Sequence, residues 1–449
     1  MSMSIEFALL MFPALLVLIF LGFPVAFSLM GVALGFGLLR FGDNAITLFV
    51  AKVDDVASNY VLGAVPLFIF MGSLLERSGV AERLFEAIHM WTRRLPGGLA
   101  IGTVLLCVVF AASTGIVGAT ETVVGLLAIP VMLRYAYNKS LISGTICAGG
   151  SLGTIIPPSV VVVILGPVAD VSIGDLFAGM IIPGLMLAGC YILYILVRCT
   201  IVPSDGPRLS ADEDDLPLGQ KIVMTLTALV PPFMLIATVL GSILGGLATP
   251  TEAAACGAVG SVIMTIAYRT FSFAVLKEAL YKTVVITAMI LLILIGGTMF
   301  AGVFTAAGGL IGVQNLMAAA ELTNWETMAI LLLLAFVAGF VLDLISLMLI
   351  VVPIAMPIIA SFVFFDLDPG SVKVWFSICF LIMIQTSYLT PPMAPAIFYL
   401  RGISPPEITL MHMYKGVIPF IVLHMVVLAS VLALPQLALW LPTILFRGF

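Results

Sequence analysis

Inside an apolar segment of this 449-residue chain lies the stretch Gly149-Gly150-Ser151-Leu152-Gly153-Thr154-Ile155-Ile156-Pro157-Pro158-Ser159, which ends in a proline pair. A second stretch of the same form is Gln385-Thr386-Ser387-Tyr388-Leu389-Thr390-Pro391-Pro392. Proline lacks an N–H and clashes with the preceding turn, so each pair would break a helix. In hydrocarbon, the freed backbone groups persist only where they face protein or a water-filled cavity. Two such breaks therefore predict ion or substrate sites of the kind that secondary transporters use.

Composition places the chain in a membrane. Of its residues, 62% are hydrophobic and 9% are charged, and the mean hydropathy is +1.27, which no soluble globular domain matches. A net charge of -5 leaves no basic face for phosphates, so nucleic acid is excluded as a partner. The three histidines show no ligand spacing and the six cysteines include no C-x-x-C. We therefore expect a membrane protein that is not an enzyme and holds no cofactor.

The two halves of the chain resemble each other. A polar linker at 203–220 separates residues 1–202 from residues 221–449. Four features recur across it in the same order, at an offset of about 223 to 234 residues, among them Pro24 with Pro250 and the two proline pairs. Such self-similarity indicates an internal duplication.

Charges around the apolar segments predict an inverted topology. The segments 98–131 and 327–365 are too long for one ordinary span and are interrupted near the middle by polar residues. Arginines flank the first at both ends and acidic residues flank the second, so each is expected to return to its starting side as a re-entrant hairpin. With 140–165 and 372–400 as broken helices, five spans remain per half. An odd number inverts the second half and places both termini outside the cytoplasm.

The expected hairpin tips and helix breaks carry the oxygen atoms that could bind ions and substrate. Carbonyls at helix C-termini and hydroxyls of Ser and Thr suit Na⁺, whereas helix N-termini suit a carboxylate. The candidate substrate-binding residues are Ser113, Thr114, Ser151, Ser159 and Thr390. The candidate Na⁺ ligands are Thr120, Gly153, Thr154, Asp343, Ser346, Thr386 and Ser387.

Each candidate also has a structural interpretation. Asp343 lies in an apolar run, where a carboxylate costs at least about 2.5 to 3.5 kcal/mol near the membrane centre unless it is partnered. A bound Na⁺ would be such a partner, but Asp343 could instead cap the second hairpin arm. Glu121 and Glu252 each follow a threonine at an expected helix start and are interpreted as caps. The Ser and Thr hydroxyls could simply bond to their own helices.

Several motifs resemble one known family. They are Gly22-Phe23-Pro24-Val25-Ala26-Phe27, the stretch from Ala111 to Thr120 with Ala128-Ile129-Pro130, the stretch from Ala148 to Ser159, Thr249-Pro250-Thr251-Glu252-Ala253-Ala254-Ala255 and Thr390-Pro391-Pro392. Together they are similar to the large membrane subunit of tripartite ATP-independent periplasmic (TRAP) transporters, the DctM-like permeases of the ion transporter superfamily. Relatives often carry a Ser-Gly-Ser-Ser type sequence at the first tip, where this chain has Ser113-Thr114-Gly115. This departure affects which tip hydroxyls bind ion or substrate.

The resemblance implies an all-α, elevator-type fold in the bacterial inner membrane with both termini periplasmic. It also implies Na⁺ as the coupling ion, a small four-helix membrane subunit and a periplasmic substrate-binding protein that delivers an organic acid. We therefore expect sodium-coupled import of a small carboxylate. Two alternatives stay open: a single-component sodium/anion symporter of the same superfamily, and a non-transporting scaffold or channel.

Overall fold

A computed structural model describes residues 7–115, 118–208, 217–392 and 394–447. This part of the chain is helical throughout and contains no strand. The helices of the first half are α2 Met11–Phe20, α3 Val25–Phe41, α4 Asn44–Ala57, η1 Tyr60–Gly63, α5 Ala64–Glu76, α6 Val80–Thr92, α7 Gly98–Thr114, α8 Ala119–Arg134, α9 Lys139–Ser151, η2 Leu152–Thr154, α10 Val160–Ala169 and α11 Ile173–Ile201. Those of the second half are α12 Leu218–Leu244, α13 Pro250–Ala267, α14 Phe273–Ala306, α15 Gly309–Ala319, α16 Asn324–Ala338, α17 Leu344–Ile359, α18 Pro369–Leu389, α19 Pro395–Ile403, α20 Leu410–Ala433, α21 Gln436–Pro442 and η3 Thr443–Arg447.

Within the described residues, six helices are long and apolar enough to cross a membrane: α11, α12, α13, α14, α18 and α20. A seventh span results if α4 and the segment Tyr60–Glu76, which meet at a bend of 53°, are taken together. The helices α2 and α3, where the sequence predicts two further spans, have only 10 and 17 residues. The count of ten spans and the side on which the termini lie therefore stay predictions.

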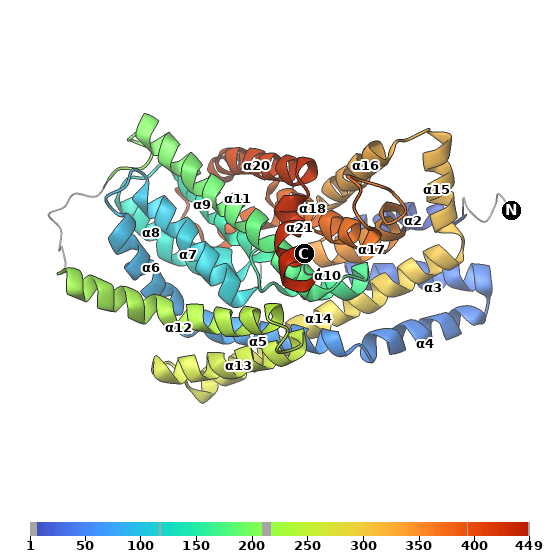
Figure 1. Cartoon of the computed structure of the whole chain (residues 1–449), viewed down its shortest axis with the longest axis horizontal. Coiled ribbons are helices and arrows are strands. Elements are labelled where there is room, and N and C mark those ends of the chain that lie inside the picture. The colour runs from blue at the N-terminus through green and yellow to red at the C-terminus, as the bar shows by residue number, and fades with distance from the viewer. Residues whose placement is uncertain (1–6, 116–117, 209–216, 393, 448–449) are drawn as a thin grey trace.

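One layer of the molecule is built from long helices that run side by side. In Figure 1, α12, α13, α5, α14 and α4 form this layer, and α14 packs against α3, α4 and α5. Local capping explains where α13 begins: the Thr249 hydroxyl accepts the Glu252 N–H at 3.3 Å, and the Glu252 carboxylate accepts the Thr249 N–H at 2.8 Å. The interpretation of Glu252 as a cap is thus confirmed. We call the layer of α3, α4, α5, α12, α13 and α14 the scaffold layer.

The second layer holds two helix pairs and two broken helices. The first pair, α7 with α8, covers most of the expected hairpin 98–131, and the second, α16 with α17, covers 324–359 of the expected 327–365. The chain breaks between α9 and α10 and again between α18 and α19, at the two proline pairs, both of which contain a cis peptide bond. The broken helices 140–165 and 372–400 are therefore observed as breaks. Whether the helix pairs re-enter the membrane stays a prediction.

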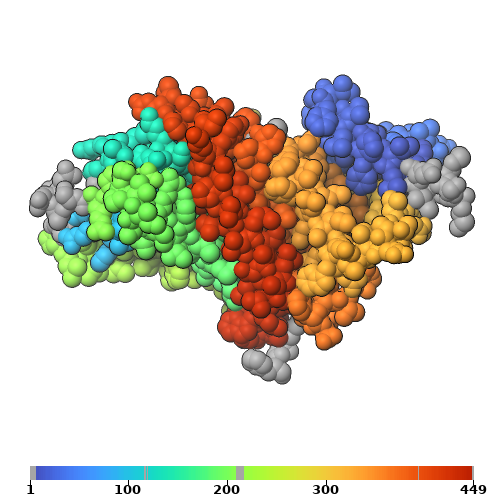
Figure 2. Space-filling view, turned by 90° about the horizontal axis from the view of Figure 1, so that it is seen from above, coloured from blue at the N-terminus to red at the C-terminus, as the bar shows by residue number. Residues whose placement is uncertain are grey.

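In the scaffold layer, helices of one half pack on helices of the other half. In the scaffold layer, α3 packs on α14 while α13 packs on α5, so each helix contacts an element of the opposite half. In the other layer, α7 packs on α9 and α16 packs on α18. Figure 2 shows the C-terminal segment lying across the middle of one face, with green and cyan first-half helices on one side and orange second-half helices together with the blue N-terminal helices on the other. Residues 209–216 of the expected linker lie outside the described part of the chain.

Candidate functional site

A central cavity of about 310 Å³ lies where the two layers meet. It brings together both turns of the helix pairs and both helix breaks. Its lining comprises Gly115, Val160, Val161, Asp343, Leu344, Ile345, Tyr388, Pro395 and Tyr399 from the second layer, and Ile69, Ile286, Met289 and Ile290 from the scaffold layer. The volume suits a small organic molecule.

The first helix pair meets the first break directly. The Val160 N–H at the start of α10 donates to the Gly115 carbonyl at 3.3 Å. Gly115 has a φ of +60°, and a Cβ there would lie 2.9 Å from the Pro158 carbonyl oxygen. Glycine is therefore needed at Gly115 both for its backbone conformation and for the close approach of the proline pair.

The second helix pair begins its second arm at Asp343, which lies at the cavity. The Asp343 carboxylate accepts the N–H groups of Ile345 at 3.1 Å and Ser346 at 3.2 Å, and the Ser346 hydroxyl also donates to it. The side chain is exposed to the cavity and is not enclosed by protein. The turn between α16 and α17 opens onto the cavity, which keeps Asp343 accessible. A cation ligand role for Asp343 and Ser346 stays a prediction beside the observed cap.

Tyr399 connects the two turns across the cavity. Its ring packs on Gly118, where a Cβ would lie 2.9 Å from a ring carbon, and it lies near enough to Asp343 for the two to interact electrostatically. Both Tyr399 and Tyr388 were missed by sequence reasoning. The only sequence feature that points to them is their place beside the second proline pair.

Glu121 is the most unusual charged group in the second layer. One carboxylate oxygen accepts the Gly118 N–H at 2.7 Å, which confirms its interpretation as a cap. The side chain is nevertheless fully buried, and its other oxygen has no hydrogen-bond partner. It packs directly against Gly150 in the last turn of α9. The Tyr388 hydroxyl lies beside the carboxylate and is a potential donor to it, although no hydrogen bond is formed in this geometry. A buried oxygen without a donor is available to a cation.

One further buried oxygen without a partner lies at the same turn of α9. The Gln385 amide donates to the Ser151 hydroxyl at 3.1 Å, which ties the two broken helices together, while the Gln385 amide oxygen is buried without a partner. Ser151 follows Gly150 in sequence, so this oxygen and the Glu121 carboxylate flank the same turn of α9. Sodium prefers oxygen ligands of this kind. Among the described residues, no cluster of three or more His, Cys, Asp or Glu side chains could hold a metal ion.

Most of the predicted hydroxyls bond to their own helices. Ser113, Thr114, Ser151, Thr154, Thr386, Ser387 and Thr390 each donate to a backbone carbonyl three or four residues earlier, at 2.7 to 3.1 Å. Ser159 is buried with no partner for its hydroxyl, Thr120 is buried, and Gly153 lies in the buried turn η2. The five predicted substrate-binding residues are not among those that line the cavity. Their lone pairs can still accept bonds, so both sets of roles stay predictions.

The cavity can attract a negative group even without a basic side chain. The helices α10 and α19 both begin at it, with Val160 and Pro395 in its lining, and neither start carries a side-chain cap. The helix dipole makes such a start weakly positive, although the Val160 N–H is bonded to Gly115 and Pro395 has no N–H. The described lining contains no Lys or Arg. A carboxylate would therefore be held by helix starts, tyrosine hydroxyls and bound cations.

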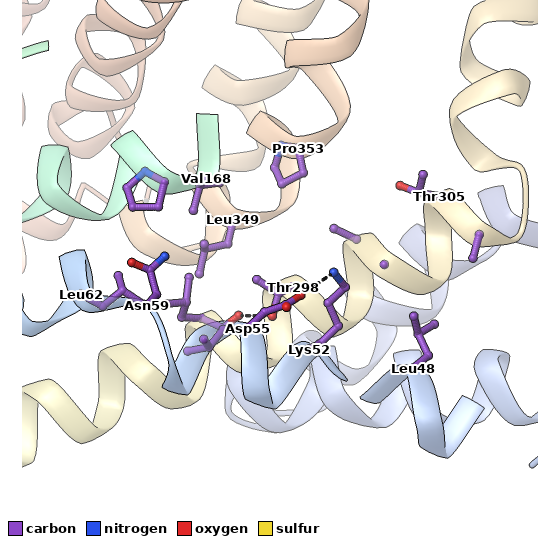
Figure 3. A pocket seen from close by; sticks show the side chains of 16 residues that line it. Leu48, Lys52, Asp55, Asn59, Leu62, Val168, Thr298, Thr305, Leu349 and Pro353 are labelled. Atoms are coloured by element: carbon purple, nitrogen blue, oxygen red, sulfur yellow. Dashed lines mark hydrogen bonds and ion pairs between the residues drawn. The ribbon is translucent and has the colours of Figure 1, made fainter. Parts of the chain in front are cut away.

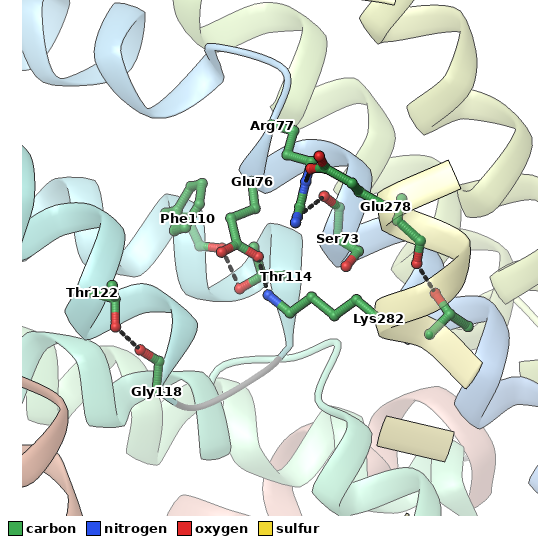
Figure 4. Close-up of polar contacts among 11 residues, drawn as sticks. Ser73, Glu76, Arg77, Phe110, Thr114, Gly118, Thr122, Glu278 and Lys282 are labelled. Atoms are coloured by element: carbon green, nitrogen blue, oxygen red, sulfur yellow. Dashed lines mark hydrogen bonds and ion pairs between the residues drawn. The ribbon is translucent and has the colours of Figure 1, made fainter. Parts of the chain in front are cut away.

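On the scaffold side, ion pairs fix α5 to α14 close to the first helix pair. Lys282 is paired with Glu76, and Arg77 with Glu278 at 3.1 Å (Figure 4). In the same view, Thr114 lies close to this cluster. A Cβ at Gly72 would lie 3.1 Å from the Thr114 Cα, so α5 approaches the end of α7 backbone to backbone.

Comparison with known proteins identifies the family. The family model described as the tripartite ATP-independent periplasmic transporter, DctM component, matches residues 12–437. The chain belongs to this family. The DctM component is the large membrane subunit of a TRAP transporter, and the relatives below are transporter permeases, not enzymes.

Individual relatives cover nearly the whole length of this DctM-family chain. It is 29% identical over 416 residues to the C4-dicarboxylate TRAP transporter large permease of Pseudomonas aeruginosa, with 92% of this chain and 93% of that protein covered. It is 29% identical to the sialic acid TRAP transporter large permease of Vibrio cholerae (96% and 97% covered) and 28% identical to the ectoine/5-hydroxyectoine large permease of Ruegeria pomeroyi (97% and 98% covered). Among solved structures, the YdaH transporter of Alcanivorax borkumensis matches with a TM-score of 0.61, at 15% identity over 88% of this chain and 89% of that one. That likeness concerns the fold alone.

Proposed function

We propose that this TRAP large permease imports a small organic acid and couples its movement to Na⁺. The observation that carries the proposal is the central cavity, where two uncapped helix starts meet both helix-pair turns beside the buried Glu121. A carboxylate in the cavity gains from the helix starts, but no basic side chain neutralises it there. A cation bound beside it would supply that charge.

The buried carboxylate supports coupling to a cation. An ionised Glu121 without a partner for one oxygen is costly inside a membrane protein, and a bound Na⁺ would offset that cost. The neighbouring acceptor on Gln385 has the same need. The predicted ligand Thr120 lies beside Glu121 on the first helix pair, and the predicted ligands Gly153 and Thr154 lie at the first break, beside the turn of α9 against which Glu121 packs.

The family supports two partners, a small membrane subunit and a periplasmic binding protein. The relatives' names indicate C4-dicarboxylates, sialic acid and ectoine as the first acids to test. The large and small subunits are reconstituted into liposomes, and uptake of radiolabelled succinate, sialic acid and ectoine is measured with the cognate binding protein outside.

We expect uptake of one acid to require an inward Na⁺ gradient and the liganded binding protein together. Full uptake by the large subunit alone would favour the single-component symporter. Full uptake in Na⁺-free buffer under a proton gradient would reject Na⁺ as the coupling ion. A lack of both uptake and counterflow for every acid would favour a scaffold.

A further inference from the structure

Three cavities follow one another along α14. The first is lined by Lys277 to Ile286, the central cavity by Ile286 to Ile290, and a third, of about 550 Å³, by Leu294 to Ala306. The predicted topology places the third, at the C-terminal end of α14, on the extracellular side. We call it the outer cavity (Figure 3).

Two more helices line both the central and the outer cavity. On α10, Val160 and Val161 face the central cavity while Pro167 and Val168 face the outer one. On α17, Leu344 and Ile345 line the central cavity, and Leu349 and Pro353 line the outer one. Three helices shared between the two cavities make them successive parts of one path between the layers.

One helical turn separates the two cavities. Ile290 and Leu294 are four residues apart on α14, which is about 6 Å along a helix. Just beyond, α14 contacts α17: a Cβ at Gly297 would lie 2.7 Å from the Leu349 Cβ. This contact lies beside the outer cavity, since Leu294, Thr298 and Leu349 all line it.

A lysine stands in the outer cavity. Lys52, on α4, is the only basic residue in the described lining of both the outer and the central cavity. Its aliphatic stem crosses Gly302 of α14, where a Cβ would lie 3.4 Å from the Lys52 Cε. Its ammonium group bonds the Asp55 carboxylate at 3.0 Å, as Figure 3 shows. Asn59 joins the lining nearby, and its side-chain oxygen accepts the Val61 N–H while its amide group carries N–H donors.

The Lys52–Asp55 pair is easy to exchange. The exposed fractions of the two side chains are 32% and 64%, and exposed pairs three residues apart on a helix add little to stability. An incoming carboxylate can therefore replace Asp55 on Lys52, with Asp55 turning into water. By contrast, the Lys282–Glu76 pair has exposed fractions of 27% and 18% and joins two different helices, as a structural pair does.

We propose that the outer cavity is a vestibule in which Lys52 receives the carboxylate of the transported acid before the acid reaches the central cavity. This inference rests on the proposed import of a carboxylate. Because Asp55 neutralises Lys52 in the resting cavity, Lys52 acts by direct pairing with the incoming carboxylate once Asp55 turns away. The helix starts at the central cavity then take over the negative charge.

The vestibule's charge can be tested without knowing the substrate. Thr298, which lines the outer cavity, is replaced by Cys in a background where the exposed Cys256 is Ser. Membrane-impermeant methanethiosulfonates of opposite charge, sulfonatoethyl and trimethylammonioethyl, are then applied from outside to the reconstituted complex. If the Lys52 charge lies about 8 Å from the introduced cysteine in water-like surroundings, removing it changes the ratio of anionic to cationic reaction rates about fivefold.

Because Asp55 offsets Lys52, we expect the two reagents to react at similar rates in wild type. Lys52→Gln should lower the anion-to-cation rate ratio about fivefold, and Lys52→Arg should retain the wild-type ratio. The matched control is Lys373→Gln, because Lys373 also pairs with an aspartate, Asp170, at 2.9 Å but does not line the outer cavity. It should leave the ratio unchanged. Equal ratios in wild type and Lys52→Gln would overturn the inference.

Transport then tests the receiving role, with whichever of succinate, sialic acid or ectoine is taken up fastest. Lys52→Gln should raise KM severalfold and leave kcat close to wild type, and added choline chloride should raise the wild-type KM more than that of the variant. If the wild type takes up an acid and Lys52→Gln has the same KM for that acid, this inference is overturned while the proposed function stands. If the wild type takes up none of the three acids, the proposed function fails and this inference with it.

Discussion

Replacing Glu121 with Gln separates a cation ligand from a simple helix cap. In the wild type, the Glu121 carboxylate accepts the Gly118 N–H at 2.7 Å. The amide of the variant keeps an oxygen for this bond but removes the negative charge from a fully buried position. A cation that loses a charge-assisted contact loses about 1.5 to 3 kcal/mol of binding, so half-saturating Na⁺ should rise roughly 10- to 150-fold. If Glu121 only caps α8, the loss is confined to its interaction with the helix dipole, about 0.3 to 1 kcal/mol of stability.

The assay is the thermal midpoint of the purified complex, measured against Na⁺ concentration with choline keeping the ionic strength constant. In Na⁺-free buffer the variant should be at least as stable as wild type, because a buried charge without a partner has been removed. The matched control is Glu252→Gln, since Glu252 occupies the same capping position at α13 but is exposed. It should leave the Na⁺ dependence unchanged.

The reasoning is refuted by one specific combination of results. If Glu121→Gln has the wild-type half-saturating Na⁺ concentration and a lower midpoint in every buffer, Glu121 is a cap and nothing more. The coupling ion would then have to be held by carbonyls and hydroxyls around Gly153 and Thr154.

Three further predictions follow from the same geometry. Asp343→Asn retains one side-chain oxygen, which can accept the N–H groups of Ile345 and Ser346, so it should preserve folding. If Asp343 binds Na⁺, the Na⁺ concentration for half-maximal uptake rises in the variant, and an unchanged value leaves Asp343 as a cap. Gly150→Ala would make a Cβ overlap with the Glu121 carboxylate, so it should lower the yield of folded protein. The control Gly189→Ala has open space around its Cβ and should be neutral. Equal yields of the two variants would contradict the close packing at Gly150. Single cysteines at Leu95 and Glu326 should be labelled by impermeant thiol reagents from the cytoplasm and from outside, respectively, and labelling of both from one side would contradict the inverted topology.

Local sequence chemistry was sufficient to predict the helix breaks. Each of these two proline pairs removes backbone donors and follows a stretch rich in Gly, Ser or Thr. That stretch distinguishes them from Pro231-Pro232, which lies inside the continuous helix α12. The chain does break at Pro157-Pro158 and Pro391-Pro392, and helices turn within the two long apolar segments near Gly115 and Asp343. Boundaries near these points were predicted to within a few residues, apart from the end of the second pair, where α17 stops at Ile359.

The composition of the site could not be predicted in the same way, because it depends on which residues meet across the layers. Tyr399 reaches the cavity only because Gly118, far away in sequence, leaves room for its ring. The burial of Glu121 depends on Gly150, and the exposure of Asp343 depends on how its turn faces the scaffold layer. Hydroxyl groups were the least predictable, since a serine in a helix bonds to its own backbone unless tertiary contacts turn it away.

Coupling is tested most directly by asking whether the acid itself moves sodium. The large and small subunits are reconstituted into liposomes with equal Na⁺ on both sides, the liganded binding protein is added outside, and an inward gradient of the transported acid is imposed while ²²Na⁺ uptake is followed. The proposed function predicts acid-dependent ²²Na⁺ accumulation that is strongly reduced in Glu121→Gln at the same Na⁺ concentration. Entry of the acid without any accompanying ²²Na⁺ would contradict it.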